Sequence, residues 1–505
     1  MLGVPAGPRG AGEALLSGVT HDSRRVCPGD LYVALPGGHH HGAEFSGDAA
    51  AAGAVAVLTD ARGSRAAAAA RLPVLVVPDP RACVGQVSSW VFGNPSARLL
   101  LLGVTGTSGK TTTTYFLEAA LQMAGHRTGL IGGVQTRIAG EVTASTLTTP
   151  EAPDLQALFA VMAERGVTAA AMEVSSHALA LGRVAGISYD VAIFTNLSHD
   201  HLDFHADIDD YFAAKAKLFT PEYTQVGVVN VDDKYGRMLA GSAPVPVTTF
   251  SADGNPGADW RATDVRLGTD GSALRVVGPG GVEADGSVAL PGPFNVSNAL
   301  GAVVAAVEAG IDLQTAVTGV AACPGVPGRL QQVNAGQDFT VLVDYSHKPA
   351  AVEAVLRALR PVTQETLVIV LGCGGDRDAA KRPAMGAIAA RLADVAIFTS
   401  DNPRSEDPLA ILAAMLDGAI DVPQAQRAHV IVEPDRAAAI GLAIASAGRG
   451  DVVVLAGKGH ETGQYVAGSV LPFDDRQVAM EALARQRARH APRPTNLAPS
   501  DSEDV

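Results

Sequence analysis

An apolar run from Leu99 to Leu102 leads directly into a glycine-rich segment, Gly103-Val-Thr-Gly-Thr-Ser-Gly-Lys-Thr-Thr-Thr113. A strand, glycines, a lysine and a helix in this order predict a phosphate-binding loop in an α/β fold. Lys110 would add a mobile cation, and the Thr111 hydroxyl is a ligand that suits Mg²⁺. The residues predicted to bind ATP are Gly106, Thr107, Ser108, Gly109, Lys110, Thr111 and Thr112.

The spacing of this loop is a variant, because Val104 stands where the common form has its first glycine. A glycine-rich turn that binds nothing is the simpler alternative. The joint presence of strand, glycines, Lys-Thr and helix argues against it.

The chain has 505 residues, more than one hydrophobic core organises, so two or three domains are expected. Turn residues at Asn94–Ala97 and Pro324–Gly328 suggest the boundaries. The predicted parts are a small N-terminal α/β domain over residues 1–97, a central domain over 98–327, a C-terminal domain over 328–488 and a flexible tail over 489–505.

Short apolar runs alternate with helical stretches through the two large domains. This alternation predicts a mostly parallel, doubly wound central sheet and a second, Rossmann-like sheet in the C-terminal domain. Residues 251–290 predict hairpins added to the central sheet. The expected strands are Pro73–Val77, Leu99–Val104, Val167–Val174, Val191–Thr195, Val226–Val231, Thr340–Asp344, Thr366–Leu371, Val395–Thr399 and Val452–Leu455.

The formal net charge of -14 argues against non-specific nucleic-acid binding, which uses Lys and Arg to neutralise phosphates. Anionic substrates would have to be attracted locally, by lysine, arginine, helix N-termini and Mg²⁺. No apolar run approaches the length of a membrane span, and no signal-peptide pattern opens the chain. We expect a cytoplasmic monomer with small-molecule substrates and with neither nucleic-acid nor membrane partners.

Two acidic segments follow neighbouring predicted strands. The first, Glu173-Val-Ser-Ser-His177, places Glu173 where open α/β sheets bind ligands, so it is a candidate for Mg²⁺. The second, Thr195-Asn-Leu-Ser-His-Asp-His-Leu-Asp-Phe-His205, loosely resembles a binuclear metallo-hydrolase pattern. The residue between Asp203 and His205 breaks that spacing, and a hydrolase would leave the phosphate loop without a role.

Eight motifs along residues 20–480 together resemble the Mur ligase family, ATP-dependent amino-acid-adding enzymes of peptidoglycan precursor synthesis, and within it the MurE type. They are Thr-Gly-Thr-Ser-Gly-Lys-Thr-Thr, Glu-Val-Ser-Ser-His, Thr-Asn-Leu-Ser-His-Asp-His-Leu-Asp, Ala-Ala-Lys, Gly-Pro-Phe-Asn-Val-Ser-Asn, Val-Asp-Tyr-Ser-His-Lys-Pro, Gly-Cys-Gly-Gly-Asp-Arg-Asp and Gly-Lys-Gly-His-Glu.

The resemblance implies that Lys215 is carbamylated by CO₂ and holds a second Mg²⁺ together with Glu173 and His201. It implies that Thr111 binds the nucleotide's Mg²⁺. Further roles implied by the resemblance are adenine contacts for Asn295 and Asn298, and contacts with the triphosphate and ribose for Arg329 and Asp344 as the domains close.

For the nucleotide-linked substrate, the resemblance assigns His21 and Ser23 to the uridine diphosphate part. Thr148, Thr149, Ser175 and Arg183 match residues that hold the muramoyl-peptide, and the charge of Arg183 complements its carboxylates. The run His39–His41 departs from the family pattern. A solvated loop is favoured there over a metal-binding tract.

The run Asp401-Asn-Pro-Arg404 predicts which amino acid is added. An arginine fork at Arg404, helped by Arg377 and Asn402, would pair with a distal carboxylate and repel a distal ammonium. The resemblance therefore implies diaminopimelate rather than lysine, in either its meso or LL form. The predicted diaminopimelate site is Arg377, Asp401, Asn402, Pro403, Arg404, Gly457 and Glu461.

Together these features predict a three-domain ligase that joins diaminopimelate to UDP-N-acetylmuramoyl-L-alanyl-D-glutamate through an acyl phosphate. Within the ligases, the alternatives are a lysine-adding relative and a folylpolyglutamate synthetase. A different class is a phosphate-loop ATPase or kinase that makes no amide. It would turn over ATP without the amino acid.

Overall fold

The computed structural model describes residues 15–490, so the predicted tail from residue 491 onward lies outside the described residues. The chain forms two compact units, and it passes from the first to the second at Pro324 and Gly325, within the turn residues Pro324–Gly328 that suggested a boundary. Two short segments, Leu267–Gly271 and Leu290–Gly292, group with the second unit. The predicted domain bounds at residues 97 and 327 stay a prediction.

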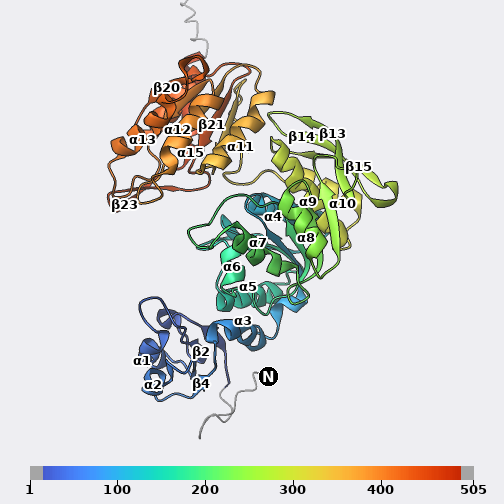
Figure 1. Ribbon diagram of the computed structural model, residues 1–505, viewed down its shortest axis with the longest axis vertical. Helices are drawn as coiled ribbons and strands as arrows, with labels where there is room; N and C mark the ends of the chain where they lie inside the picture. Colours follow the sequence, from blue (N-terminus) through green and yellow to red (C-terminus); the bar gives the residue numbers. More distant parts are fainter. Residues whose placement is uncertain (1–14, 491–505) are drawn as a thin grey trace, which may run out of the picture. The chain divides into compact units, whose positions relative to one another are not determined.

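The first sheet is small, parallel and formed by the N-terminal residues (Figure 1). Its strands pair in sequence order, and buried Leu31, Val33 and Leu58 form part of its core. The strands are β1 (Gly18–Thr20), β2 (Asp30–Val33), β3 (Ala56–Thr59) and β4 (Val74–Val76); the helices are α1 (Ser46–Ala51), α2 (Ser64–Ala68) and α3 (Pro80–Val91).

The second sheet has eleven strands in the order β15-β14-β13-β12-β11-β10-β5-β9-β6-β7-β8. Its centre is parallel, with Val104 of β5 in register with Glu173 of β9 and Ile193 of β10. The mostly parallel central sheet predicted from the sequence is thus confirmed. The strands are β5 (Leu100–Thr105), β6 (Thr128–Ile131), β7 (Gln135–Ile138), β8 (Glu141–Ala144), β9 (Ala169–Glu173), β10 (Tyr189–Phe194), β11 (Thr224–Asn230), β12 (Val247–Ser251), β13 (Trp260–Leu267), β14 (Ser272–Val277) and β15 (Glu283–Val288).

The segment 251–290 differs in part from the predicted hairpins. β14 and β15 form an antiparallel hairpin, but β12 and β13 pair in parallel. The register of β9 explains the position of Glu173, because its last residue ends level with the phosphate loop. The helices of this part are α4 (Lys110–Met123), α5 (Ala152–Glu164), α6 (Ser176–Ala180), α7 (Ile208–Ala216), α8 (Lys234–Ser242), α9 (Pro293–Glu308) and α10 (Leu313–Ala321).

The second unit contains a six-stranded sheet in the order β16-β17-β21-β18-β19-β20. All its pairs are parallel except β16 with β17, and its inner strands are apolar, which confirms the predicted Rossmann-like sheet. The strands are β16 (Gln331–Gln332), β17 (Thr340–Asp344), β18 (Leu367–Leu371), β19 (Val395–Phe398), β20 (His429–Val432) and β21 (Val452–Ala456), with a separate hairpin of β22 (Gly463–Val466) and β23 (Ser469–Pro472).

Helices of the second unit pack on this sheet, with Ile440, Ile444 and Leu483 in its core. The helices are α11 (Pro349–Leu359), α12 (Lys381–Leu392), α13 (Pro408–Ile420), α14 (Arg436–Ser446) and α15 (Asp475–His490). α15 includes the first two residues of the predicted tail. No helix between residues 15 and 490 has the length and apolar character that crossing a membrane requires.

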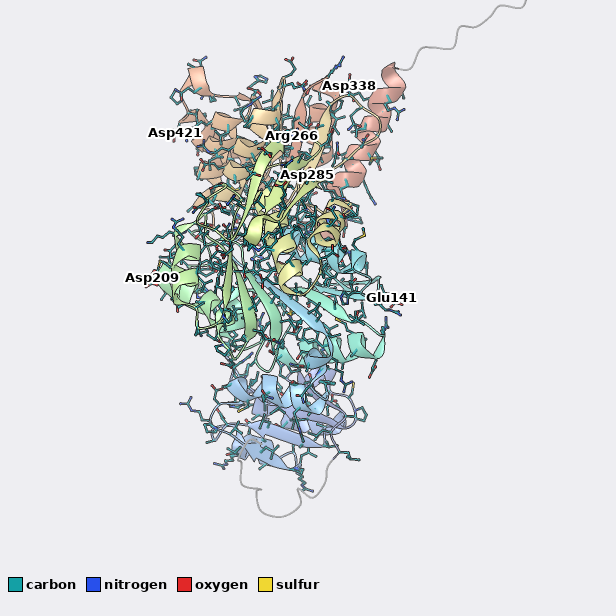
Figure 2. All side chains as sticks on the ribbon, turned by 90° about the vertical axis from the view of Figure 1, so that its right-hand side faces the viewer. Glu141, Asp209, Arg266, Asp285, Asp338 and Asp421 are labelled. Atoms are coloured by element: carbon teal, nitrogen blue, oxygen red, sulfur yellow. The ribbon has the colours of Figure 1, made fainter. Side chains whose placement is uncertain are left out.

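Acidic side chains from many elements lie on the outer surface. Figure 2 shows Glu141, Asp209, Asp285 and Asp421 on separate elements, and each is exposed. This distribution is consistent with the negative net charge. Because the outer surface is acidic, anionic substrates would have to be attracted by positively charged groups within the binding sites.

Candidate active site

The phosphate loop joins the end of β5 to the first residue of α4. Gly106 and Gly109 have φ values of 147° and 90°, which side chains disfavour. A Cβ at Gly106 would lie 2.0 Å from Thr195 Oγ1, and one at Gly109 would lie 2.3 Å from Asn298 Oδ1. Backbone conformation and close packing therefore both require glycine at these two positions.

Two lysines converge on one carbonyl oxygen of this loop. Lys110 Nζ donates to Gly106 O at 2.8 Å and to Thr107 O at 3.0 Å, and Lys215 Nζ donates to the same Gly106 O at 2.8 Å. Lys215 is buried on α7. Burial, followed by the nearby charge of Lys110, holds the pKa of Lys215 well below its usual range.

A carboxylate and a hydroxyl meet beside the loop. Thr111 Oγ1 donates to Glu173 Oε1 at 3.0 Å, and the backbone N–H of Gly133 donates to the same oxygen at 2.9 Å. Thr111 is in the first turn of α4, and Glu173 is the last residue of β9. The predicted Mg²⁺ ligands Thr111 and Glu173 are therefore brought together in a largely buried position.

His201 reaches the same region through aromatic neighbours. Its ring centroid lies 6.0 Å from that of Tyr211, and Lys215 Nζ lies 4.6 Å from the Tyr211 centroid on that ring's face. His201 has a left-handed backbone, with φ of 56°, and its ring also makes an edge contact with His177. His201 and Lys215 thus both flank Tyr211.

The other histidines of this segment have different surroundings. His205 is buried between Ser176 Oγ at 3.0 Å and Asp210 Oδ2 at 3.1 Å, whereas His199 and Asp203 are exposed. Within residues 15–490, no group of three or more His, Cys, Asp or Glu side chains is placed to hold a metal ion. The histidines therefore do not gather in the way that the metallo-hydrolase interpretation requires.

Two contacts on the phosphate loop were missed by sequence reasoning. Asn196 Oδ1 accepts from Ser108 N at 3.0 Å, and its Nδ2 donates to Ser108 O at 3.1 Å. Tyr211 OH lies 3.1 Å from Thr107 Oγ1. Asn196 lies two residues after the last residue of β10, so its position at the strand's carboxyl end was the available signal.

The asparagine pair predicted to contact adenine lies near the start of α9. Asn298 Nδ2 donates to Asn295 Oδ1 at 3.2 Å, and both residues are buried. Asn298 also packs against Gly109, as the close approach at that glycine requires. The pair therefore adjoins the phosphate loop.

Three of the predicted muramoyl-peptide residues lie together at the end of β9. Thr149 Oγ1 donates to Glu173 O at 2.8 Å and accepts from Ser175 N at 3.1 Å. Arg183 Nη1 donates to Thr149 O at 3.3 Å, and its Nε lies 2.8 Å from Glu151 Oε1. Thr148 lies close by, because a Cβ at Gly133 would be 3.1 Å from its Oγ1.

The residues predicted for the uridine diphosphate part lie after β1. His21 and Ser23 are half-buried on either side of Asp22, which caps a short 3₁₀ helix, Ser23–Arg25. In the nearby histidine run, His39 and His40 are exposed as predicted for a solvated loop. His41 differs, because it caps the helix Gly42–Phe45 and its Nε2 lies 3.0 Å from Asp60 Oδ1.

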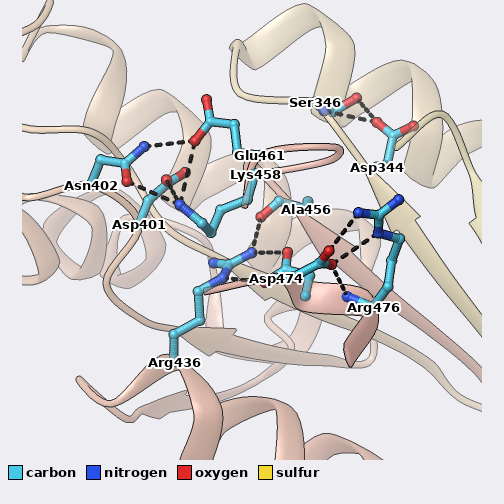
Figure 3. A network of polar contacts seen from close by, with 11 residues as sticks. Asp344, Ser346, Asp401, Asn402, Arg436, Ala456, Lys458, Glu461, Asp474 and Arg476 are labelled. Atoms are coloured by element: carbon cyan, nitrogen blue, oxygen red, sulfur yellow. Dashed lines mark hydrogen bonds and ion pairs between the residues drawn. The ribbon is translucent and has the colours of Figure 1, made fainter. Parts of the chain in front are cut away.

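Two further predicted nucleotide residues belong to the second unit. The Asp344 carboxylate accepts from the backbone N–H groups of Leu330 and Ser346, each at 2.8 Å, and from Ser346 Oγ (Figure 3). The Arg329 guanidinium lies over the ring of Tyr345, 4.8 Å from its centroid. Asp344 is thus fixed by its own backbone surroundings, and Arg329 by an aromatic face.

The predicted amino-acid site contains a closed network of side chains (Figure 3). Asn402 Oδ1 accepts from Lys458 Nζ at 3.0 Å, and Asn402 Nδ2 donates to Glu461 Oε2 at 2.9 Å. Lys458 Nζ lies 3.4 Å from Glu461 Oε2 and 3.8 Å from Asp401 Oδ1. A Cβ at Gly457 would lie 2.5 Å from Asp401 Oδ2, so this glycine is needed where the network closes.

Lys458 was missed as a site residue, although it lies within the motif Gly-Lys-Gly-His-Glu. Its side chain is fully buried, which the sequence did not indicate for a lysine. Burial also raises the pKa of Asp401, and the charges of Arg436 and Lys458 oppose that rise. Lys458 is the buried cation that contacts Asn402, Glu461 and Asp401 directly.

The two arginines of this site approach the same glycine. A Cβ at Gly374 would lie 3.0 Å from Arg404 Nη1 and 3.8 Å from Arg377 Cγ. Arg404 Nη1 donates to Gly375 O at 2.7 Å, and its guanidinium lies 5.9 Å from the Tyr465 ring centroid. Pro403 is buried beside Gly375, whereas Arg377 is exposed.

Comparison with known proteins supplies the family. Three family models match: "Mur ligase family, catalytic domain" over residues 15–89, "Mur ligase middle domain" over 104–306, and "Mur ligase, glutamate ligase domain" over 328–459. A protein of Streptomyces coelicolor named UDP-N-acetylmuramoyl-L-alanyl-D-glutamate--2,6-diaminopimelate ligase is 59% identical over 96% of this chain and 95% of its own. A protein of the same name from Corynebacterium glutamicum is 48% identical over 96% and 94%.

Solved structures agree with these relatives. A structure with the same ligase name has a TM-score of 0.70 at 33% identity and covers 94% of this chain and 95% of its own. A folylpolyglutamate synthase of Mycobacterium tuberculosis has a TM-score of 0.59 at 21% identity, with 82% of this chain and 96% of its own covered, so it shares the fold. On the strength of the identity and coverage of these relatives, the chain belongs to the Mur ligase family.

Proposed function

We propose that this chain is an ATP-dependent ligase that joins diaminopimelate to UDP-N-acetylmuramoyl-L-alanyl-D-glutamate. The observation that carries the proposal is that the predicted amino-acid site contains both a cation, Arg404, and a carboxylate, Glu461. A cation and a carboxylate there suit an amino acid whose far end bears both a carboxylate and an ammonium. The names of relatives with 48–59% identity support the same substrates.

The first step is phosphoryl transfer from ATP to a glutamate carboxylate of the nucleotide substrate, which gives an acyl phosphate and ADP. Lys110 would stabilise the transferred phosphoryl group, a role supported by its ammonium, which donates to two carbonyl oxygens of the loop and would exchange them for phosphate oxygens. The amine of diaminopimelate then attacks the acyl carbon. The N–C bond forms, the C–O bond to phosphate breaks, and the amine proton passes to solvent.

Mg²⁺ fits the residues beside the loop. Thr111 Oγ1 and Glu173 Oε1 are oxygen ligands 3.0 Å apart in a buried position, which suits a hard cation. Thr111 would hold the nucleotide's Mg²⁺, and Glu173, His201 and a carbamate on Lys215 would hold a second Mg²⁺. When bound, Mg²⁺ supplies positive charge that offsets the phosphates.

The buried amine of Lys215 supports the carbamate. Carbamylation requires a neutral amine, whose lone pair bonds to the CO₂ carbon while one N–H proton leaves to water. Burial and the charge of Lys110 lower the pKa of Lys215 and so favour that neutral form. The resulting anion would attract Lys110 instead of repelling it.

The function is tested by product mass. The protein is incubated with ATP, Mg²⁺ and the nucleotide dipeptide, and then with meso-diaminopimelate, LL-diaminopimelate or lysine. We expect a tripeptide product with diaminopimelate and stoichiometric ADP. Incorporation of lysine alone would overturn the assignment of Arg404, and ADP release without an amide product would indicate an ATPase.

The carbamate is tested with ¹³C-bicarbonate. We expect a carbamate signal in the ¹³C spectrum of the wild-type protein and its loss in Lys215→Arg, because the guanidinium stays charged and offers no neutral amine to CO₂. Activity should fall when dissolved CO₂ is removed and return with bicarbonate. Full activity of Lys215→Arg would contradict the role.

The remaining expectations form part of the proposal. ATP and UDP-linked sugars are solutes of the cytoplasm, so we assign the protein to that compartment with small-molecule partners. The two units carry the site residues on a single chain, which supports a monomer. Sedimentation at working concentration tests the oligomeric state.

A further inference from the structure

The carboxylate of Glu151 lies between two arginines from distant parts of the chain. Arg183 Nε is 2.8 Å from Oε1, and Arg81 Nη1 donates to Oε2 at 3.0 Å. The side chains of Glu151 and Arg183 are 15% and 16% exposed. Because little water reaches Glu151 and Arg183, their ion pair is stronger than a surface pair, whereas the Arg81 side chain is 34% exposed and its pair with Glu151 is partly screened by solvent.

Arg81, Glu151 and Arg183 together carry an excess of positive charge. Two guanidinium groups and one carboxylate carry a net charge of +1. Without Arg81, Glu151 and Arg183 would form a neutral pair, and a further carboxylate would gain little from approaching it. Arg81 therefore offsets Glu151 and leaves Arg183 with an attraction for a second anion.

Arg183 is also oriented by the neighbouring substrate region. Its Nη1 donates to Thr149 O, and Thr149 Oγ1 in turn accepts from Ser175 N. Nη1 makes this hydrogen bond, and Nε faces Glu151 as an ion pair, so Nη2 is the nitrogen proposed to donate to a ligand.

Packing fixes Arg81 in this position. It lies in the first turn of α3, where Asp79 accepts from its backbone N–H at 2.9 Å. A Cβ at Gly85 would lie 2.3 Å from Ala185 O, so α3 approaches the segment that carries Arg183 very closely. Rigid contact of this kind keeps the Arg81 guanidinium within reach of Glu151.

We propose that Arg81 is a positioning and specificity residue: by sharing Glu151 it leaves the positive charge of Arg183 incompletely offset and available to a carboxylate of the peptide part of the nucleotide substrate. The inference rests on the proposed function. It extends the substrate site to a residue on α3, which the family motifs do not include.

The same interface offers a matched control. Arg25 Nη2 lies 2.9 Å from Asp154 Oδ1, on the first turn of α5, just after Glu151. This pair also joins the N-terminal segment to α5. Asp154 makes no contact with Arg183 among the described residues, so Arg25→Gln removes an ion pair of the same kind without changing the charge at Arg183.

The test is a double-variant cycle with KM measured for each substrate. We expect Arg81→Gln to raise KM for the nucleotide dipeptide about tenfold, with KM for ATP and diaminopimelate unchanged. The double variant Arg81→Gln/Glu151→Gln should recover most of the loss, because the charge of Arg183 is then no longer offset by the Glu151 carboxylate. Arg25→Gln should leave all three KM values near wild type.

A substrate analogue gives a second readout. In this analogue, the glutamate carboxylate that is not joined to the amino acid is converted to a carboxamide. The wild-type preference for the carboxylate should shrink about tenfold in Arg81→Gln and return in the double variant.

Two outcomes separate the two proposals. An active wild-type enzyme whose preference is unchanged in Arg81→Gln, or a double variant no better than the single one, would overturn the role of Arg81. A wild-type protein that makes no tripeptide would overturn the proposed function instead. Circular dichroism and thermal melts of each variant establish that it is folded.

Discussion

The phosphate loop and the network around Lys458 present charge in opposite ways. In the loop, two lysines rest on one backbone carbonyl, and glycines bring the main chain close. Around Lys458, a lysine, an asparagine and two carboxylates bind one another before any ligand arrives. In the phosphate loop, the lysines donate to carbonyl oxygens that a ligand's oxygens could replace. In the Lys458 network, the side chains hold one another in fixed positions.

The difference matches the ligands proposed for each region. All the charges of a triphosphate are negative, so it can be held by cations and backbone N–H groups. An amino acid with opposite charges at its far end must be read by groups of fixed orientation. Substitutions should therefore affect mainly chemistry in the loop, and both folding and recognition in the Lys458 network.

The largest effect is expected for Lys110→Ala. Turnover should fall about 10³-fold, because a cation that stabilises the transferred phosphoryl group is lost. Stability should change by less than about 0.5 kcal/mol, since the substitution removes hydrogen bonds to carbonyl oxygens and at the same time relieves repulsion of Lys215. ADP release and urea unfolding measure the two effects, and exposed Lys217→Ala serves as control.

A large loss of stability in Lys110→Ala would break the comparison. It would mean that the loop, like the second region, depends on its side chains to fold.

Lys458→Met should lower the free energy of unfolding by about 3 kcal/mol, because buried carboxylates lose their cation. The pKa of Asp401 is already raised by burial and should rise further in the variant. A carboxyl group whose pKa is higher in the folded protein than in the unfolded protein stabilises the folded state at low pH. The loss of stability in Lys458→Met should therefore grow as the pH rises above about 4. Urea unfolding across pH measures this.

Adding Asp401→Asn to Lys458→Met should restore about 1 kcal/mol. A single variant as stable as wild type at neutral pH would show that the network is not needed for folding.

The lowered pKa of His347 predicts how the stability of the second unit depends on acid. Burial lowers its pKa to about 4, while Lys381 and Lys348 lie near enough to add to the shift. Stability from the neutral imidazole is complete above its ordinary pKa of 6.5 and is lost as pH falls toward 4. His347→Gln should remove about 2 kcal/mol of the acid-induced loss, measured by urea unfolding at pH 7.5 and 4.5.

An unchanged acid dependence in His347→Gln would mean that another group controls it. Glutamine suits this test because its side-chain amide can also donate to Tyr345 O, which lies 2.7 Å from His347 Nδ1. The substitution therefore removes the titrating group and keeps a donor for this contact.

The smallest effect is expected at Tyr465. Its ring supports the Arg404 guanidinium at the outer limit of a cation–π contact, so Tyr465→Leu should raise KM for diaminopimelate two- to threefold, about 0.5 kcal/mol. Tyr465→Phe should behave as wild type, since it keeps the ring. Leu471→Ala, on the same hairpin and half exposed, is the matched control.

An equal effect of the Phe and Leu substitutions would show that the hydroxyl matters rather than the ring face.

The sequence predicted the parts of the fold that local pattern determines. Apolar runs predicted four inner strands of the central sheet, β5, β9, β10 and β11, and four strands of the second sheet, whereas the inner strands β6 and β12 were missed. The glycine spacing predicted the phosphate loop. The sequence pattern failed for β7 and β8, which are short and polar, and for β20, which begins with His429 and lies at a sheet edge. Edge strands bury little, so their sequence carries a weak pattern.

The candidate site was predicted less completely for a different reason. Lys215 meets Gly106 across 109 positions of sequence, and Lys458 meets Asn402 across 56. No local pattern reports that a lysine will be buried against a distant carbonyl or amide. Family motifs identified Lys215, but only the packed structure identifies Lys458 and the partners of Arg183.

The buried pair of Arg436 and Asp475 has a practical consequence for making shorter forms of the protein. Both side chains are fully inaccessible, and Arg436 Nη2 also donates to Ala456 O at 3.0 Å (Figure 3). The match to the family's third domain stops at residue 459, before α15 begins. A fragment trimmed to that match would leave a guanidinium stranded in an apolar interior, so an expressible fragment must extend through α15.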